Sequence, residues 1–226
     1  MDLDVNERLQ RVLAHALSRR PDALFLTGDF CAAEPRQDMF HQLRPLLDAT
    51  GVPYYITPGN HDDRGMLRNA FFLRGHNDAP VYGLVQVADR DFLFLDSSPG
   101  SVDDEQIEWL GRALDAYPDA DLVMHHPPVP LGVTFMDNNY PLRDTKPLLN
   151  VLSADGRPRH VFCGHFHSGR SVVWNNLTVY LCPPTSFFID PEPEEFRQED
   201  LPPAYQLLEW SADGLRVVPT FVPENA

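Results

Sequence analysis

The sequence predicts a single α/β domain in which two β-sheets form a sandwich with helices on its outer faces. Helical and extended patterns alternate up to about residue 154 of the 226, and strand patterns dominate the rest. Apolar runs of about five residues repeatedly end in glycine and polar side chains, as expected of strands that lead into functional loops. No serine- and glycine-rich linker or long charge run divides the chain, so we expect one domain over residues 1–226.

Two pairs of a helix and a strand open the chain. Apolar residues recur at helical spacing over residues 5–19, and the run 21–29 predicts a buried strand that ends in Gly28 and Asp29. A second helix is expected near residues 36–49, followed by a second strand within 52–63 that also ends in polar residues.

The remainder of the chain predicts two further helices and a larger number of strands. The helices are expected over 103–117, where apolar residues again show helical spacing, and near 144–154. The strand candidates are a pair within 80–98 around a tight turn at 89–91, then 120–128, 159–169, 171–176, 177–183, 205–210 and 214–222.

The composition excludes several classes of protein. A formal net charge of -15 repels polyanions, so we expect no nucleic-acid polymer as a partner. No apolar stretch reaches the roughly 18 residues of a membrane span, and the acidic start lacks the pattern of a secretory signal, so a cytoplasmic protein is expected. Cys31, Cys163 and Cys182 lack Cys-x-x-Cys spacing, which favours core residues over disulfides or zinc ligands.

Four predicted strands end in side chains that can bind a metal ion. Loops at the carboxyl ends of strands converge in layered α/β folds, so we expect the four groups to meet at one edge of the molecule. They offer oxygen and nitrogen ligands without thiolate, which suits Mn, Fe, Co or Zn. In chain order the groups are Asp29; Asn60 with His61 and Asp62; His125 with His126; and His165 with His167.

Each of these groups also has a purely structural interpretation. A glycine followed by Asp29 is common turn chemistry, and residues 60–62 suit a turn or a helix N-cap. The pair His165 and His167 is the most specific, because on an extended backbone both side chains point to one side and Phe166 points to the other. Recurrence at four successive strand ends favours a common site over four separate turns.

Together these motifs resemble the calcineurin-like metallophosphoesterases. The blocks GNHDD, HHPPVPLG, MDNNYPLRD and CGHFHSG are similar in particular to the bacterial class III cyclic-nucleotide phosphodiesterases. The resemblance runs from about residue 8 to 222 and implies the fold of that family, a two-sheet sandwich flanked by helices. The residues on which it rests are Gly28-Asp29, Gly59-Asn60-His61-Asp62, His125 and Gly164-His165-Phe166-His167.

The resemblance implies a centre for divalent transition metals, namely Mn²⁺, Fe²⁺ or Fe³⁺, Zn²⁺ or Co²⁺. Asp29 would bridge two ions, with Asn60, His125 and His165 completing one site and His167 belonging to the other. His126 would be a neighbour of the centre rather than a ligand.

The resemblance also implies two catalytic residues. His61 would face the scissile phosphate, where it would stabilise the transition state or donate a proton to the leaving oxygen. Asp62 would orient His61.

One motif of the family is absent from the 226 residues. The family opens with Asp-x-His at the end of its first strand, whereas here a helix pattern begins almost at Met1. Asp2 and Asp4 suit a helix N-cap better than a metal site. We therefore expect a fold without that first strand and one tightly bound ion instead of two, because Asp29 and His167 alone leave the second site short of ligands. The alternative is that the natural start lies upstream.

The sequence thus predicts a metal-dependent phosphodiester hydrolase that acts on cyclic nucleotides such as 3',5'-cyclic AMP or on similar small phosphodiesters. Within the enzyme class, a glycerophosphodiesterase or a phosphomonoesterase is the alternative, because no motif defines the group that holds the organic part of the substrate. A catalytically impaired member that binds a nucleotide or a partner protein is the alternative outside it. A homodimer is compatible with the sequence.

Overall fold

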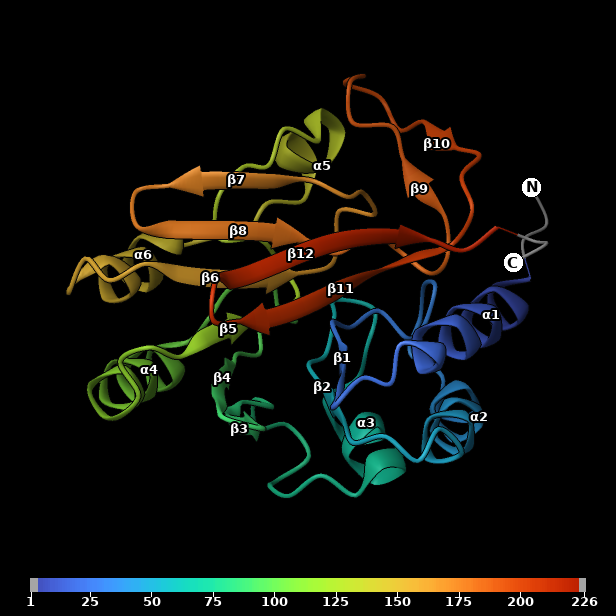
Figure 1. Cartoon of the computed structure of the whole chain (residues 1–226), viewed down its shortest axis with the longest axis horizontal. Coiled ribbons are helices and arrows are strands. Elements are labelled where there is room, and N and C mark those ends of the chain that lie inside the picture. The colour runs from blue at the N-terminus through green and yellow to red at the C-terminus, as the bar shows by residue number, and fades with distance from the viewer. Residues whose placement is uncertain (1–3, 224–226) are drawn as a thin grey trace.

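A six-stranded mixed sheet is the largest element of the structure, a computed structural model that describes residues 4–223 (Figure 1). Its four inner strands run parallel to one another, and the two edge strands β3 and β7 are antiparallel to their neighbours. In spatial order the strands are β3 (Gly83–Val87), β4 (Arg90–Phe94), β5 (Asp121–Val123), β6 (Arg159–Cys163), β8 (Leu177–Leu181) and β7 (Ser171–Trp174).

Two strand pairs cover one face of this sheet and complete the sandwich. They are the parallel pair β1 (Leu24–Leu26) and β2 (Tyr54–Ile56), and the antiparallel pair β11 (Ala204–Ser211) and β12 (Gly214–Phe221). Aromatic rings fill the space between the layers. Phe92 of β4 lies between Phe25 of β1, at 4.8 Å between ring centroids, and Trp210 of β11, at 5.4 Å. The predicted two-sheet sandwich is therefore confirmed.

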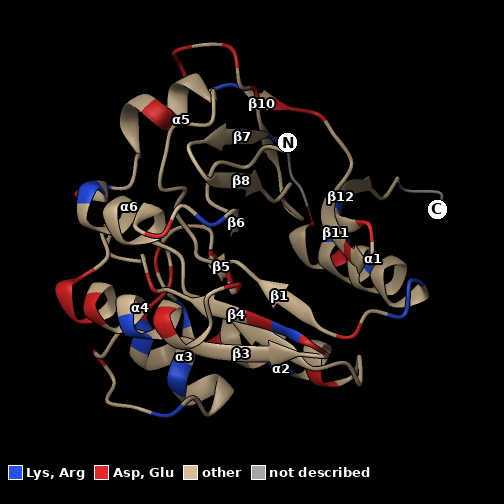
Figure 2. Cartoon of the chain, turned by 60° about the vertical axis from the view of Figure 1, so that its left-hand side comes forward, with Lys and Arg blue, Asp and Glu red and all other residues tan. Residues whose placement is uncertain are grey.

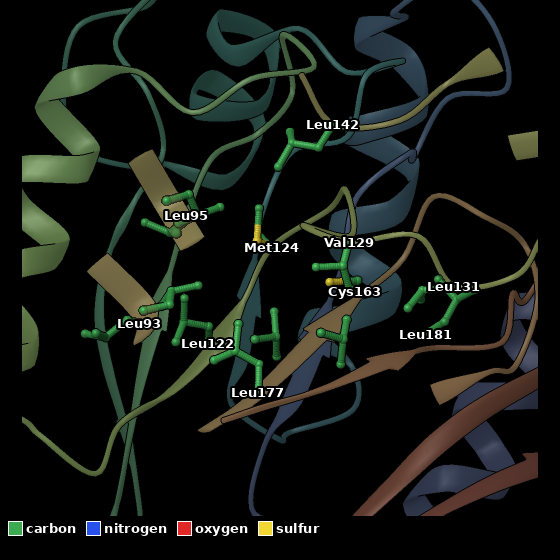
Figure 3. Close-up of a cluster of buried hydrophobic side chains, with 14 of the residues drawn as sticks. Leu93, Leu95, Leu122, Met124, Val129, Leu131, Leu142, Cys163, Leu177 and Leu181 are labelled. Carbon is green, nitrogen blue, oxygen red and sulfur yellow. The ribbon is translucent and has the colours of Figure 1, made fainter. Parts of the chain in front are cut away.

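Helices cover the two outer faces of the sandwich. α1 (Val5–Ser18), α2 (Gln37–Asp48) and α3 (Arg64–Phe71) bury one apolar cluster against β1 and β2. α4 (Asp104–Ala116) and α6 (Thr145–Ser153) cover the outer face of the large sheet. Figure 3 shows the core beneath them, to which β4, β5 and β8 contribute Leu93, Leu122 and Leu177 respectively.

Short-range signals explain the ends of several helices. Asp4 caps α1, since its carboxylate accepts hydrogen bonds from the backbone N–H groups of Asn6 and Glu7, as predicted; Asp2 lies outside the described residues. Asp63 caps α3 in the same way through the Met66 amide. Charged side chains lie mainly on the helices and connecting loops, while the strands are largely free of them (Figure 2).

Three short elements and one turn depart from the sequence prediction. Neither α5 (Thr134–Asn139) nor the small antiparallel pair β9 (Phe188–Ile189) and β10 (Gln198–Glu199) was predicted. The turn between β3 and β4 is a two-residue turn, because Val87 pairs with Arg90; it therefore begins before the predicted position. Ala88 takes φ 52° there, a conformation for which alanine carries no sequence signal.

Among the residues that the structure describes, no helix has the length and apolar character needed to cross a membrane. This agrees with the absence of a long apolar stretch in the sequence.

The layer formed by α1 to α3 depends on buried aromatic packing, which can be tested with a matched pair of substitutions. Phe40 of α2 is fully buried, and Phe72, just after α3, is 74% exposed. We expect Phe40→Ala to lower the free energy of unfolding by about 3–5 kcal/mol, because it leaves a cavity. Phe72→Ala should lower it by less than about 1 kcal/mol, since it removes only an exposed ring over Arg44. Equilibrium unfolding in urea measures both; equal losses would contradict the assigned burial.

Candidate metal centre

The carboxyl ends of β1, β2, β5 and β6 bring together side chains from all four predicted groups. The Nε2 atom of His125 is the point on which they converge. It lies 3.1 Å from Asp29 Oδ2, 3.2 Å from Asn60 Oδ1 and 3.1 Å from His165 Nδ1. Three atoms with lone pairs, from segments far apart in the sequence, thus lie within 3.2 Å of a fourth, His125 Nε2.

Backbone carbonyl groups determine which nitrogen of each histidine faces the centre. A carbonyl oxygen only accepts hydrogen bonds, so the ring nitrogen next to it carries the N–H and the other nitrogen is left with its lone pair. The free nitrogens are therefore Nε2 of His125, Nδ1 of His165 and Nε2 of His167. The carbonyl groups belong to Thr27, Tyr140 and Phe187, at 2.5 Å from His125 Nδ1, 3.1 Å from His165 Nε2 and 2.9 Å from His167 Nδ1 respectively.

The electrostatics of the cluster favour a positive charge at its centre. Burial raises the pKa of Asp29, but the facing His125 and the His61 amide, which donates to Asp29 Oδ1 at 3.0 Å, hold that pKa well below its usual range. Burial lowers the pKa of His125, but Asp29 outweighs it and raises that pKa overall. Burial, reinforced by His125, lowers the pKa of His165 to about 3, so its ring is neutral at neutral pH and its lone pair is available.

The donor set fits a divalent metal ion. One carboxylate oxygen, one amide oxygen and two imidazole nitrogens converge, and when both rings are in their neutral forms none of the four atoms is a hydrogen-bond donor. Such a set of lone pairs is stabilised by a cation, and its mixture of oxygen and nitrogen suits the transition metals named above.

His167 lies beside this group. Its ring packs against Phe187 with 4.4 Å between centroids, and Asp29 is close enough to influence its pKa, which burial lowers. Its free Nε2 is therefore a further lone pair on the loop after β6.

Glycines allow the loops to pack backbone against backbone. Gly28 has φ 95°, and a Cβ atom on it would lie 2.4 Å from the Gly59 nitrogen. A Cβ atom on Gly59 would lie 2.2 Å from Asp29 Oδ1. Neither contact is sterically allowed, so both glycines of the motif are required by close approach.

The backbone at the histidine pair differs from the prediction. β6 ends at Cys163, and His165 and His167 have φ 68° and 48°, so the segment is not extended. The alternation argument for the direction of their side chains is therefore wrong, although Phe166 is buried in the core. Asp29 also has positive φ, 59°. Asp and His adopt this left-handed conformation more readily than most residues, and such strain is typical of functional sites.

Asp62 does not orient His61, which corrects the sequence-based expectation. Its carboxylate accepts backbone hydrogen bonds from Asp29 at 2.8 Å, Phe30 at 2.9 Å and Gly59 at 2.9 Å. Asp62 thus ties the loop after β1 to the loop after β2. Burial raises its pKa to about 6, partly offset by the Gly59 amide.

His61 takes its orientation from another group. Its Nδ1 atom lies 2.9 Å from the Ala33 carbonyl oxygen, and its backbone N–H is bound to Asp29. The Nδ1 atom therefore carries the proton shared with Ala33, and Nε2 is left for another partner.

The structure adds Ser97, which the sequence analysis did not single out. Its hydroxyl lies 3.0 Å from His126 Nδ1 and accepts a hydrogen bond from the His126 amide. The His126 ring packs on His165 with 4.2 Å between centroids, and ring nitrogens of His125, His126 and His165 lie within 4.8 Å of one another. His126 is thus in contact with the centre, while one nitrogen is occupied by Ser97. Ser97 could have been found from the sequence, because polar residues follow β4 just as they follow β1, β2, β5 and β6.

Comparison with known proteins identifies related sequences and folds. The model of the calcineurin-like phosphoesterase family matches residues 4–169. A protein of Fibrobacter succinogenes named "Probable cyclic nucleotide phosphodiesterase" is 31% identical over 213 residues, covering 92% of this chain and 82% of that protein. One of Arcobacter nitrofigilis named "Probable glycerophosphodiester phosphodiesterase GpdQ" is 27% identical over 233 residues, covering 93% and 82%.

The fold has a counterpart among solved structures. The crystal structure of a dimetal phosphatase from Danio rerio aligns with a TM-score of 0.65 and 14% sequence identity, covering 96% of this chain and 89% of that one. At this identity the likeness concerns the fold alone.

The role of Asp62 can be separated from that of its neighbour Asp63. We expect Asp62→Ala to weaken Mn²⁺ binding roughly 10- to 100-fold, because the loops that present Asp29 and Asn60 lose their common anchor. Asp63→Ala removes only the α3 cap, at about 1 kcal/mol of stability, and should leave the affinity within about twofold. Titration calorimetry gives the dissociation constants, and circular dichroism shows whether each variant is folded. If Asp62→Ala misfolds, Asp62→Asn, which keeps one acceptor oxygen, should show a smaller loss. Unchanged affinity in folded Asp62 variants would contradict this role.

Proposed function

This chain belongs to the calcineurin-like phosphoesterase family of hydrolytic enzymes, and on that premise we propose that it is a metal-dependent phosphodiesterase acting on a cyclic nucleotide such as 3',5'-cyclic AMP. The observation that supports this most is the convergence of Asp29, Asn60 and His165 on the Nε2 atom of His125. The name of the Fibrobacter relative supports the substrate class.

The proposed ligands divide between two positions. Asp29, Asn60, His125 and His165 would hold one divalent transition metal, and Asp29 with His167 would contribute to a second. A bound ion of this kind polarises a phosphoryl oxygen and lowers the pKa of a water molecule, so that hydroxide is available at neutral pH. Each backbone carbonyl binds one ring nitrogen of a histidine, and this leaves the lone pair of the other ring nitrogen available to a metal ion.

His61 is the residue of this chain that we propose to act on the phosphate. Its backbone amide donates to Asp29 and its Nδ1 atom is bound to Ala33, which supports a role for the remaining Nε2 at the phosphate, while the adjacent Asn60 would serve as ligand. In its doubly protonated form, with Nδ1 bound to Ala33 and a second proton on Nε2, the ring can donate to the phosphoryl oxygens or to the leaving oxygen. In 3',5'-cyclic AMP a water oxygen would bond to phosphorus, the bond from phosphorus to O3' would break, and that proton would pass to O3'.

A glycerophosphodiesterase is the second candidate. The observation that favours it is the similarity to the Arcobacter protein. That protein and the Fibrobacter protein are covered to the same extent, and the Arcobacter protein has the lower sequence identity to this chain. Both activities would use the same residues at the phosphate and would differ in the residues that contact the organic group.

Metal removal tests the proposed function directly. The protein, freed of metal with a chelator and reloaded with Mn²⁺, should hydrolyse bis(p-nitrophenyl) phosphate and 3',5'-cyclic AMP. The chelated protein should lose at least about 100-fold in rate, because the residues at the centre cannot polarise the phosphate alone. Chromatographic detection of 5'-AMP and release of p-nitrophenol measure the two reactions. Absence of hydrolysis of either substrate at full Mn²⁺ loading would exclude the proposal and favour a binding protein of the same fold.

His61 can be tested apart from the metal ligands. We expect His61→Ala to lower kcat for bis(p-nitrophenyl) phosphate by roughly 10²- to 10⁴-fold, the range typical of a positioned acid, with the metal content unchanged. His41→Ala is the matched control, because His41 is exposed on α2 and contacts only Gln37 among the described side chains. Elemental analysis accompanies the kinetics; loss of metal in His61→Ala would assign His61 to the ligands instead.

A further inference from the structure

A chain of aromatic contacts leads from one proposed histidine ligand to the other. Phe187, whose carbonyl faces His167, has its ring centroid 6.3 Å from that of Phe196. Phe196 is 5.7 Å from Phe135, and Phe135 is 5.7 Å from Tyr140. Tyr140 closes the chain, because its carbonyl accepts the hydrogen bond from His165. We refer to Phe135, Tyr140, Phe187 and Phe196 as the aromatic cluster.

The aromatic cluster lies at the edge of the protein core, against which Phe135 and Phe187 pack. Phe196 and Tyr140 are each 52% exposed, and Phe135 and Phe187 are partly buried. Their mutual contacts are edge-to-face, with interplanar angles of 60° to 76°, so no ring of the cluster is covered by a parallel neighbour within it. The half-exposed side chains of Tyr140 and Phe196 are therefore accessible to a planar group, on segments that adjoin the histidines.

The segments that carry these rings are held firmly in place. The Asp137 carboxylate accepts hydrogen bonds from the backbone of Leu131, Gly132 and Val133, which fixes the start of α5. α5 is joined to the segment around β9 and β10 by the hydrogen bond from the Thr134 amide to the Pro191 carbonyl, at 2.9 Å. Both segments lie beside each other in Figure 1.

The segment before β10 is closed by two further contacts. Asp190 donates its amide to the Arg197 carbonyl and forms an ion pair with the Arg197 guanidinium. Phe196 is therefore presented by a short loop whose ends are tied together, and its ring needs little ordering when a ligand binds.

We propose that the aromatic cluster is the subsite for the purine base of the substrate, with the base stacked on Tyr140 or Phe196 while the phosphate lies at the metal centre. Stacking of a base on an aromatic side chain raises affinity by about tenfold or more and tolerates either purine. A glycerol headgroup has no π face and gains nothing comparable from these rings. The cluster thus selects cyclic nucleotides over glycerophosphodiesters. This inference rests on the proposed function for its kinetic test, but not for the binding test below.

The kinetic test compares two substrates on the same Mn²⁺-loaded protein. We measure kcat/KM for 3',5'-cyclic AMP and for glycerophosphoethanolamine, a phosphodiester without an aromatic group. Phe196→Ala and Tyr140→Ala should each reduce the ratio of the two values about tenfold. Tyr140→Phe, which keeps the ring, should leave the ratio within about twofold of wild type. If a substitution instead disturbed the backbone at His165 or His167, kcat/KM would fall for both substrates together and their ratio would stay unchanged.

Phe72→Ala is the matched control, because Phe72 is exposed at the end of α3 and its ring lies over Arg44, outside the cluster. It should leave both kcat/KM values unchanged. An unchanged ratio in both Phe196→Ala and Tyr140→Ala, with hydrolysis of 3',5'-cyclic AMP retained, would overturn the base subsite and leave the proposed phosphodiesterase intact.

A binding measurement decides the inference even if no phosphodiester is hydrolysed. Titration calorimetry with the Mn²⁺-loaded protein compares 5'-AMP with ribose 5-phosphate, which share the phosphate and the sugar. We expect 5'-AMP to bind at least about tenfold more tightly, and Phe196→Ala to remove most of that difference. Equal affinity of the wild-type protein for the two ligands would overturn the inference, whatever the outcome for catalysis.

Discussion

The Asp62 carboxylate is the interaction on which the arrangement of the centre depends. Two of its three backbone hydrogen bonds reach the loop after β1, and the third holds the loop after β2. A parallel pair of only three residues per strand is a weak framework by itself. The buried Asp62 carboxylate accepts hydrogen bonds from amides of both loops and so holds them together, as a longer sheet would otherwise do. The two oxygen donors Asp29 and Asn60 can then stand close to each other at fixed positions.

The second half of the centre depends on the large sheet, which is more robust. His125 and His165 follow the parallel neighbours β5 and β6, whose residues are almost entirely buried between α4, α6 and the aromatic layer. The centre is therefore assembled across the sandwich, with oxygen donors from the small sheet and imidazoles from the large one. Any shift of one sheet relative to the other would change the separation between Asp29 and His125. The aromatic contacts of Phe25 with Phe92 and Phe94 oppose such a shift.

Hydrophobic periodicity and polar strand endings were sufficient to predict the sandwich, four of its helices and the segments that meet at the centre. The backbone conformation of the loops was harder to predict from the sequence. The positive φ values of Asp29 and His165 result from the loops packing against each other, and no local pattern announces them. The partner of Asp62 was misassigned for the same reason, because backbone amides of distant residues have no signature in the sequence. α5 is only six residues long and its start depends on Asp137, so its periodicity is too short to recognise.

The orientation of each proposed histidine ligand by a main-chain carbonyl has a consequence for the evolution of the protein. Thr27, Tyr140 and Phe187 hold the imidazoles through atoms that every amino acid possesses. The hydrogen bonds themselves therefore do not depend on the identity of these three side chains as long as the course of the chain is kept. A lineage could replace the rings beside the centre, and with them its preferred organic group, in single mutational steps. Divergence of substrate range within such a scaffold would leave the inorganic chemistry untouched.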